Sequence, residues 1–402
     1  MIIPEFPNQP LFDGGPETPS RPNYKRTRYN LKVITPLFGG GVNATEGKRV
    51  PDQITPIRGS SIRGQLRFWW RATSVFKNLA ELKKKELELW GGISRAKPHP
   101  SQVQITIDQT GKYNPEKEID KNELGIQYGA FPLRTDGNNN QFEPLYKFTG
   151  DFDLSIEYPK KNAEEIEDAI TAWMYFGGLG GRTRRGFGAI SKTTGVESHE
   201  IEAFHTKIKN KGAPLKGVSS LLGSRLCVRD TNSNNARKVL NEALYWLYRF
   251  RQYPRDLNTR SFGKSKWPEA NQIRSWLGSK GQTQPLFAPR AVFGLPIIFH
   301  FKERIPDSTL TPKNKERRAS PLILRPFLST SKQYGALCLV LNDPSQLNEE
   351  LCISSSKSDS KKVLPVTAKL PPSREVEEAL SKILCGKKDI LHAFLSFFEK
   401  QM

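Results

Sequence analysis

Residues 177–188 read GGLGGRTRRGFG, with six glycines, three arginines, one phenylalanine and no acidic residue. Glycine permits positive φ angles and close approach of the backbone to a ligand, and successive N–H groups can form a concave anion site. The arginine side chains have the fork geometry that suits phosphate, and the face of Phe187 could stack on a base. The stretch predicts a loop that holds a nucleic-acid backbone. The alternative is a flexible surface connection whose arginines keep the protein soluble.

The glycine spacing does not match the nucleotide-binding fingerprints. A dinucleotide motif starting at Gly178 needs glycine where Thr183 stands, and a P-loop ending at Gly263 needs glycine where Asn258 stands. The run Arg185-Gly186-Phe187-Gly188 begins like the RRM motif but fails at Ala189. These patterns therefore disfavour a nucleotide-dependent switch or enzyme.

The residues around this stretch place it between a helix and a strand. Acidic residues precede an apolar stripe of helical spacing over 163–176, and acids at a helix start suit the macrodipole. Gly177 is a plausible helix stop, and residues 187–192 read as a short strand.

The charge balance indicates a polyanionic partner. The 402 residues carry a net charge of +21. Residues 1–200 hold 28 basic and 24 acidic residues, a balance of +4, and residues 201–402 hold 34 and 17, a balance of +17. We expect no membrane association, since no apolar run reaches the length of a spanning helix.

The spacing of the cysteine and histidine residues predicts neither a metal site nor a disulfide bond. Four scattered cysteines without a C-x-x-C pair are typical of free thiols in a reducing cytoplasm. No two of the five histidines have H-x-x-x-H spacing. We therefore expect a cytoplasmic protein without metal, cofactor or small-molecule substrate.

Alternating strand and helix patterns favour an α+β fold in both halves. We expect an irregular arm at 1–23, a first domain at 24–195, a linker at 196–224 and a second domain at 225–402. The predicted strands lie at 29–37, 103–107, 152–158, 187–192, 291–301 and 335–341. The predicted helices lie at 57–82 (helical after Ser60 or Ser61 as N-cap), 163–176, 235–253, 374–384 and 389–398.

A second basic segment lies between residues 56 and 80, which hold four arginines, one lysine and no acid. Arg63, Arg67 and Arg71 are four residues apart and share one helical face. We favour RNA contact for these arginines over the alternative, internal salt bridges. Of Trp69 and Trp70, at least one is expected in the core.

Together these segments resemble the RAMP superfamily of CRISPR effector subunits. The strand ending in TPLFGGG (35–41), PIRGSSIRG (56–64) and the glycine-rich loop carry the general resemblance. RGSSIRGQLRFWWRA (58–72), FAPRAVFGLP (287–296) and RASPL (318–322) are more narrowly similar to the first RAMP subunit of the type III-B (Cmr) complex.

The resemblance implies two ferredoxin-like (RRM-type) domains with insertions and a glycine-rich loop. It implies a non-catalytic subunit that packs beside other RAMP subunits and binds the guide–target RNA duplex near the guide 3′ end, capping the assembly in antiviral defence. The residues it implies as RNA contacts are Gly178, Gly180, Gly181, Arg182, Arg184, Arg185, Arg58, Ser60, Ser61 and Arg63.

The alternative function is a RAMP endoribonuclease acting on CRISPR transcripts or target RNA. Related backbone subunits cut with an aspartate on the loop before the first helix, and here that loop holds Glu46 and Asp52. Neither aligns with the catalytic position, and an isolated carboxylate without a partner makes a poor general base. We therefore predict no catalytic residue.

Overall fold

The computed structural model describes the chain from residue 21 to 402 with gaps. The described ranges are 21–37, 57–94, 96–109, 111–115, 118–133, 146–252, 267–278, 286–301, 306–343, 349–355, 366–367, 381, 384–387 and 389–402. The predicted arm therefore lies almost wholly outside the described residues, as do residues 38–56.

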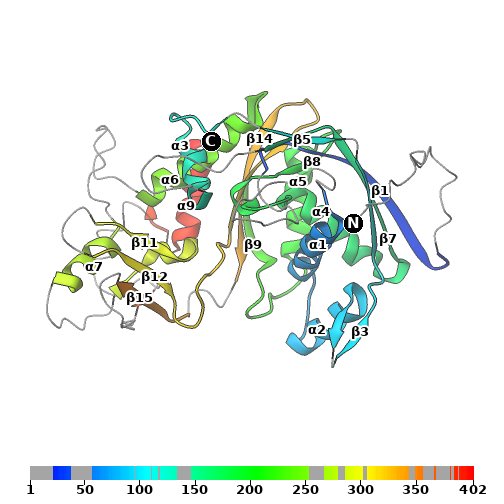
Figure 1. The fold of residues 1–402 in the computed structure, drawn as a ribbon, viewed down its shortest axis with the longest axis horizontal. Coiled ribbons are helices and arrows are strands. Elements are labelled where there is room, and N and C mark those ends of the chain that lie inside the picture. The colour runs from blue at the N-terminus through cyan, green and yellow to red at the C-terminus, as the bar shows by residue number, and fades with distance from the viewer. Residues whose placement is uncertain are drawn as a thin grey trace, which may run out of the picture.

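The first unit is a four-stranded antiparallel sheet with two helices on one face (Figure 1). In chain order its elements are β1 (Tyr24–Val33), α1 (Gly59–Thr73), β4 (Gln104–Gln109), β7 (Asp151–Pro159), α4 (Ala163–Phe176) and β8 (Ile190–Lys192). The strand order across the sheet is β4-β7-β1-β8, with every pair antiparallel. This βαββαβ succession is the split βαβ arrangement of a ferredoxin-like unit.

Several short elements are inserted into the first unit. They are α2 (Leu79–Trp90), β2 (Gly92–Ser94), β3 (Lys97–His99), β5 (Lys112–Pro115), α3 (Leu124–Gly129), β6 (Tyr146–Thr149) and the 3₁₀ turns Phe131–Leu133 and Lys160–Asn162. The β2–β3 hairpin and α2 project from the lower right of the view in Figure 1. The helix α3 instead packs against α6 of the second half, as both labels in Figure 1 show.

The second half contains a three-stranded sheet of order β13-β14-β9. Its elements are α5 (Ser198–Lys209), β9 (Ser220–Ser233), α6 (Ala236–Gln252), β13 (Leu322–Leu328), β14 (Tyr334–Asn342) and α9 (Ile390–Gln401). The succession of β9, α6, β13 and β14 repeats the start of the first unit. Within the described residues no fourth strand joins this sheet, so a second ferredoxin-like domain stays a prediction.

A separate five-stranded sheet is inserted around these elements, in the order β10-β16-β15-β12-β11. The inserted elements are α7 (Glu269–Gly278), β10 (Leu286–Phe287), β11 (Ile297–Phe299), β12 (Ser308–Pro312), β15 (Leu351–Ser355), β16 (Val366–Thr367) and the 3₁₀ turn Pro289–Phe293.

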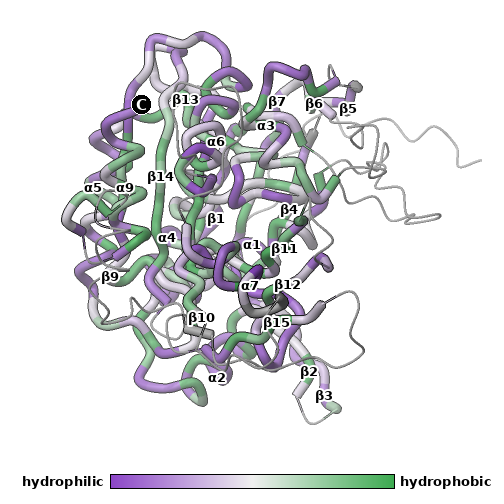
Figure 2. Tube along the Cα trace, turned by 90° about the vertical axis from the view of Figure 1, so that its left-hand side faces the viewer, coloured by the Kyte–Doolittle hydropathy of each residue, from purple (hydrophilic) through white to green (hydrophobic). Residues whose placement is uncertain are grey.

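The sheet β13-β14-β9 separates two hydrophobic cores. On β14, Ala336, Cys338 and Val340 belong to the core of the second half, while Leu337, Leu339 and Leu341 belong to the core of the first. Successive side chains of a strand point to opposite faces, so β14 is buried on both sides. Figure 1 shows β9 and β14 running through the middle of the molecule, and Figure 2 shows β14 as largely hydrophobic.

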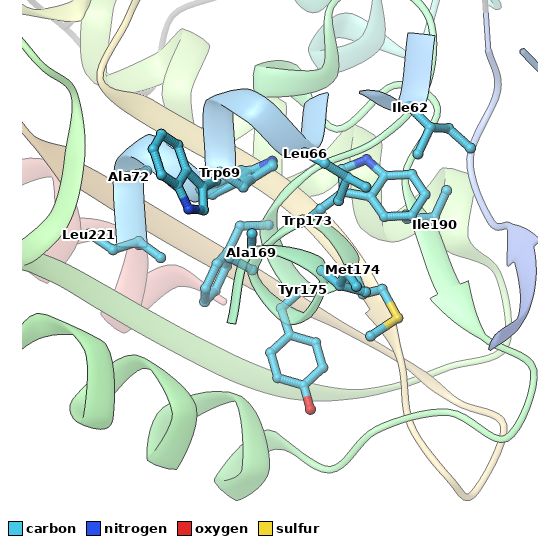
Figure 3. Packing of buried hydrophobic residues seen from close by; sticks show 14 of the residues in the cluster. Ile62, Leu66, Trp69, Ala72, Ala169, Trp173, Met174, Tyr175, Ile190 and Leu221 are labelled. Carbon is cyan, nitrogen blue, oxygen red and sulfur yellow. The ribbon is translucent and has the colours of Figure 1, made fainter. Parts of the chain in front are cut away.

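The first core is held together by the contact of α1 with α4. Figure 3 shows Leu66 and Trp69 of α1 beside Ala169 and Trp173 of α4, all of them buried. The helix α4 forms where the sequence predicts it, at 163–176, because its apolar stripe faces this core.

Other predicted elements differ from the structure. The segment 57–82 holds two helices, and α1 begins after Arg58 as N-cap instead of Ser60 or Ser61. The predicted linker 196–224 contains α5 and the start of β9, because Ile201 and Ile208 supply buried anchors. The predicted strand 187–192 is shorter, with β8 starting at Ile190, and 291–301 is partly a 3₁₀ turn.

Candidate nucleic-acid interface

The glycine-rich loop at 177–188 has a tightly determined conformation. Positive φ angles occur at Gly180 (72°), Arg182 (61°), Gly186 (75°) and Gly188 (61°). The amide of Leu179 donates to the carbonyl of Gly188 at 2.8 Å. A Cβ on Gly188 would lie 2.0 Å from the carbonyl oxygen of Leu179, so only glycine fits there.

The three loop arginines point toward backbone carbonyls of other segments. Arg182 donates to the carbonyl of Gly129 through Nε at 2.9 Å and through a terminal nitrogen at 2.7 Å. Arg184 donates to the carbonyl of Ser320, and its guanidinium lies 5.4 Å from the ring centroid of Phe68.

Arg185 reaches furthest into the protein. It is 8% exposed and donates to the carbonyls of Leu322 at 2.9 Å and Phe293 at 3.4 Å. Burial, and then the nearby Arg182, lower the pKa of Arg185 to about 9. Its guanidinium is thus used to join the loop to the second half, and it is not available at the surface for phosphate.

The structure contradicts the prediction that Phe187 stacks on a base. Its side chain is fully buried and belongs to the core of the second half, together with Leu240 and Leu244 of α6. A Cβ on Gly129 would lie 3.1 Å from its ring, so the ring contacts this backbone directly. Phe187 therefore offers no free face to a base, because a phenyl ring gains more from the apolar core beside it.

A second buried arginine reinforces the same junction. Arg325 of β13 is 1% exposed and donates to the carbonyls of Met174 at 3.1 Å, Gly177 at 2.6 Å and Ile190. Burial lowers its pKa to about 9. Two of these carbonyls close the C-terminal end of α4, where the macrodipole favours a cation. Arg325 was not among the predicted site residues, although an arginine inside the apolar run LILRPFL is a visible signal.

Two arginines of α1, Arg67 and Arg71, form salt bridges within the protein. Arg67 Nε donates to Glu86 Oε1 of α2 at 2.9 Å, and Arg71 donates to the same oxygen. Glu86 is 9% exposed, so its charge needs these partners. Both arginines therefore clamp α1 to α2 as the alternative expected, while RNA contact by Arg67 and Arg71 stays a prediction. Trp69 and Trp70 are both buried.

The comparisons with known proteins bear on this first unit. Residues 30–191 match the family model of the RAMP superfamily. The matched range includes β1, α1, α4 and the glycine-rich loop. A comparison with curated proteins gave no match.

Two solved structures of similar chain path come from Cmr proteins. The apo crystal structure of Cmr1 from Pyrococcus furiosus is 16% identical, with a TM-score of 0.47, covering 94% of this chain and 97% of that one. A chain in the cryo-EM structure of type III-B Cmr-beta, bound to cognate target RNA and AMPPnP, is 11% identical, with a TM-score of 0.39, covering 93% and 98%.

The first turn of α1 remains accessible in the first unit. Ser60 and Ser61 are exposed, and Arg58 and Arg63 are half-buried. The side chain of Arg63 has no ion-pair partner among the described residues. Ser60 lies about 12 Å along the helix from Phe68, which contacts the glycine-rich loop.

The accessible part of the glycine-rich loop is its tip. Gly178 is buried in a bridge with Ala189, whereas Gly180 is exposed and Gly181 is half-buried. The structure therefore separates the predicted contacts into two groups. The loop tip and the first turn of α1 face solvent, while Phe187 and the three arginine side chains of the loop face inward.

The outer face of the four-stranded sheet of the first unit carries ion pairs. Arg28 donates to Asp153 at 2.8 Å and Arg26 to Glu157 at 2.6 Å. Hydrogen bonds from Asn30 and then Arg28 lower the pKa of Asp153. An RRM stacks bases on aromatic side chains of this face. Here charged side chains occupy these positions, so the RRM-like run at 185–188 is not accompanied by an RRM-like stacking surface there.

The remaining predicted features are only partly visible. Glu46 and Asp52 lie outside the described residues. Searching the described ranges finds no group of three side chains able to hold a metal ion. In the same ranges, no helix has the length and apolar character to span a membrane.

Proposed function

We propose that the chain is a non-catalytic, RNA-binding RAMP subunit of a type III-B CRISPR effector. In this role it contacts the duplex of guide and target RNA near the guide 3′ end and packs beside other RAMP subunits at the end of the assembly. The match of residues 30–191 to the RAMP superfamily carries the proposal. The segments at 58–72 and 318–322 support the narrower choice of the type III-B complex.

In this proposal the accessible residues make the RNA contact. At the start of α1 the amide of Ser61 already donates to the carbonyl of Arg58 at 3.0 Å. The amides of Gly59 and Ser60 precede the intrahelical hydrogen bonds and favour a phosphate, and Arg58 and Arg63 flank that turn. The exposed backbone at Gly180 permits close approach of a second phosphate. Contacts to phosphate carry no sequence information, which suits a subunit that must accept varying guides.

The test of RNA binding is its salt dependence. The purified chain is titrated with labelled single-stranded RNA and with a guide–target duplex at several salt concentrations. The logarithm of affinity for the single strand should fall with the logarithm of salt, with a slope of about −0.7 per phosphate neutralised. An affinity that stays flat from low to moderate salt would refute RNA binding.

A single substitution tests the first turn of α1. Arg63→Ala should make this slope shallower by about 0.7 and leave thermal unfolding unchanged, because the guanidinium has no ion-pair partner in the described structure. The matched control is Lys160→Ala, which removes an exposed cation from the 3₁₀ turn that precedes α4. Equal effects of the two variants would show that only net charge matters.

A cleavage assay tests the proposal that the chain does not cut RNA. Repeat RNA and target RNA incubated with the chain, with and without a divalent cation, should stay intact. Site-specific cuts that disappear in Asp52→Ala would overturn this part of the proposal and favour the endoribonuclease.

A further inference from the structure

A group of aromatic and arginine side chains lies where α3 packs on α6. Tyr128 comes from α3, while Tyr245, Tyr248, Arg249 and Arg251 come from α6. All five side chains are half-buried, so part of each one faces solvent. We call these five residues the tyrosine–arginine patch.

The three rings form one continuous surface. The centroids of Tyr128 and Tyr248 are 5.5 Å apart, and those of Tyr245 and Tyr248 are 6.4 Å apart. The interplanar angles are 51° and 43°, so the rings are tilted and do not cover one another's faces. Such an arrangement leaves ring faces on which planar groups can stack.

The contact of α3 with α6 holds this surface rigid. Asn241 Oδ1 accepts hydrogen bonds from the amides of Gly125 and Ile126 at 3.0 and 3.1 Å. A Cβ on Gly125 would lie 1.9 Å from the carbonyl oxygen of Asn241, so the two backbones touch. The ring of Tyr128 is thus presented from a fixed helix.

The arginines of the patch are held only weakly. Arg251 lies 5.8 Å from the centroid of Tyr128 and 5.6 Å from that of Phe293, and Arg249 lies 6.0 Å from that of Tyr245. These distances are near the outer limit of a cation–π contact. Neither guanidinium forms an ion pair in the described part of the chain, and Arg182 lies close enough to Arg251 for the two charges to repel.

We propose that the tyrosine–arginine patch binds unpaired bases of an RNA strand. The bases stack on Tyr128 and Tyr245, while Arg249 and Arg251 leave the rings and contact the flanking phosphates. The inference rests on the proposed function, and it adds a second RNA surface that recognises a single strand.

The chemistry favours this occupant over a protein or an RNA duplex. Uncompensated arginines between aromatic rings are the combination that binds single strands without sequence preference. A duplex keeps its bases stacked and cannot use the rings. Because the second half of the chain carries most of the positive excess, with 34 basic and 17 acidic residues over 201–402, the surrounding field also attracts RNA.

The direct test is crosslinking of the full-length wild-type chain. Single-stranded RNA carrying 5-iodouridine is bound, irradiated and mapped by mass spectrometry. We expect crosslinks at Tyr128 or Tyr245. Crosslinks found only at other segments would overturn the proposal, and this readout does not depend on a variant folding.

Substitutions then separate stacking from charge. Tyr128→Leu should weaken single-strand binding by roughly 5- to 150-fold, the loss of one stacked base, whereas Tyr128→Phe should retain binding. Arg249→Ala with Arg251→Ala should make the salt slope shallower by about 1.4. The control pair Lys83→Ala with Lys84→Ala removes two exposed cations from α2.

The outcomes distinguish the two proposals. Absence of any RNA binding by the wild-type chain refutes the proposed function. RNA binding that is unchanged in a folded Tyr128→Leu variant refutes the patch alone. If this variant keeps its RNA affinity but no longer assembles with other RAMP subunits, the patch is a protein interface and the inference is wrong.

Discussion

Replacing Phe187 by alanine distinguishes a buried role of the glycine-rich loop from a base-stacking role. The ring is fully buried in the core of the second half, although its loop extends from the first unit. A phenylalanine buries about 150–250 Å², which at about 25 cal/mol per Å² corresponds to about 4–6 kcal/mol. Phe→Ala substitutions in cores cost about 3–5 kcal/mol, in agreement with this figure.

The assay is urea and thermal unfolding followed by tryptophan fluorescence. Trp267 lies in the core that Phe187 enters and Trp69 lies in the other core, so fluorescence reports on both. For a cooperative unit of about 200 residues, 1 kcal/mol shifts Tm by about 2–4 °C. Phe187→Ala should therefore lower Tm by about 6–20 °C.

A conservative substitution at the same position serves as the control for Phe187→Ala. Phe187→Leu keeps most of the apolar volume and should lose much less stability than the alanine variant. If Phe187→Ala unfolds like the wild type while its RNA affinity drops, the ring is exposed and stacks on a base. The inward packing described above would then be wrong.

Two further predictions concern buried polar groups. Burial, and then Lys209, lower the pKa of His205 to about 4, while Ser224 accepts its Nε2 hydrogen at 2.8 Å. Since the unfolded pKa is about 6.5, the folded state binds fewer protons, and about 3 kcal/mol of stability should disappear as pH falls from 6.5 through 4. His205→Gln should flatten this pH dependence in urea titrations, and an equally steep profile would contradict the assignment. Glu86→Gln should cost about 1–2 kcal/mol by loosening the clamp of Arg67 and Arg71, reduced by their partial exposure. An unchanged urea midpoint would show that this clamp is unimportant.

Local patterns were sufficient for several elements. The helix at 163–176 was predicted with the bounds it has, because its acids, apolar stripe and terminal glycine act within the segment itself. The helix at 235–253 was predicted to within a residue at each end for the same reason. The position of the glycine-rich loop after α4 also followed from these local signals.

Long-range packing decided what the local patterns could not. The predicted linker holds α5, whose few buried residues, such as Ile201, only find their core when β9 is alongside. The run LILRPFL of β13 is apolar at every position but Arg325, since both of its faces are covered. Periodicity cannot distinguish such a strand from a buried helix segment.

The sequence by itself determined that a glycine–arginine loop follows a helix, within a segment that matches the RAMP superfamily, and that the second half carries the positive excess. Only the tertiary structure decided where the arginines point. A guanidinium suits a phosphate, but it also donates well to backbone carbonyls, and those of Gly129, Ser320 and Leu322 are 53, 136 and 137 residues away from their donors. No local pattern contains such acceptors. The fold brings them to the loop, and the arginine side chains are bound there.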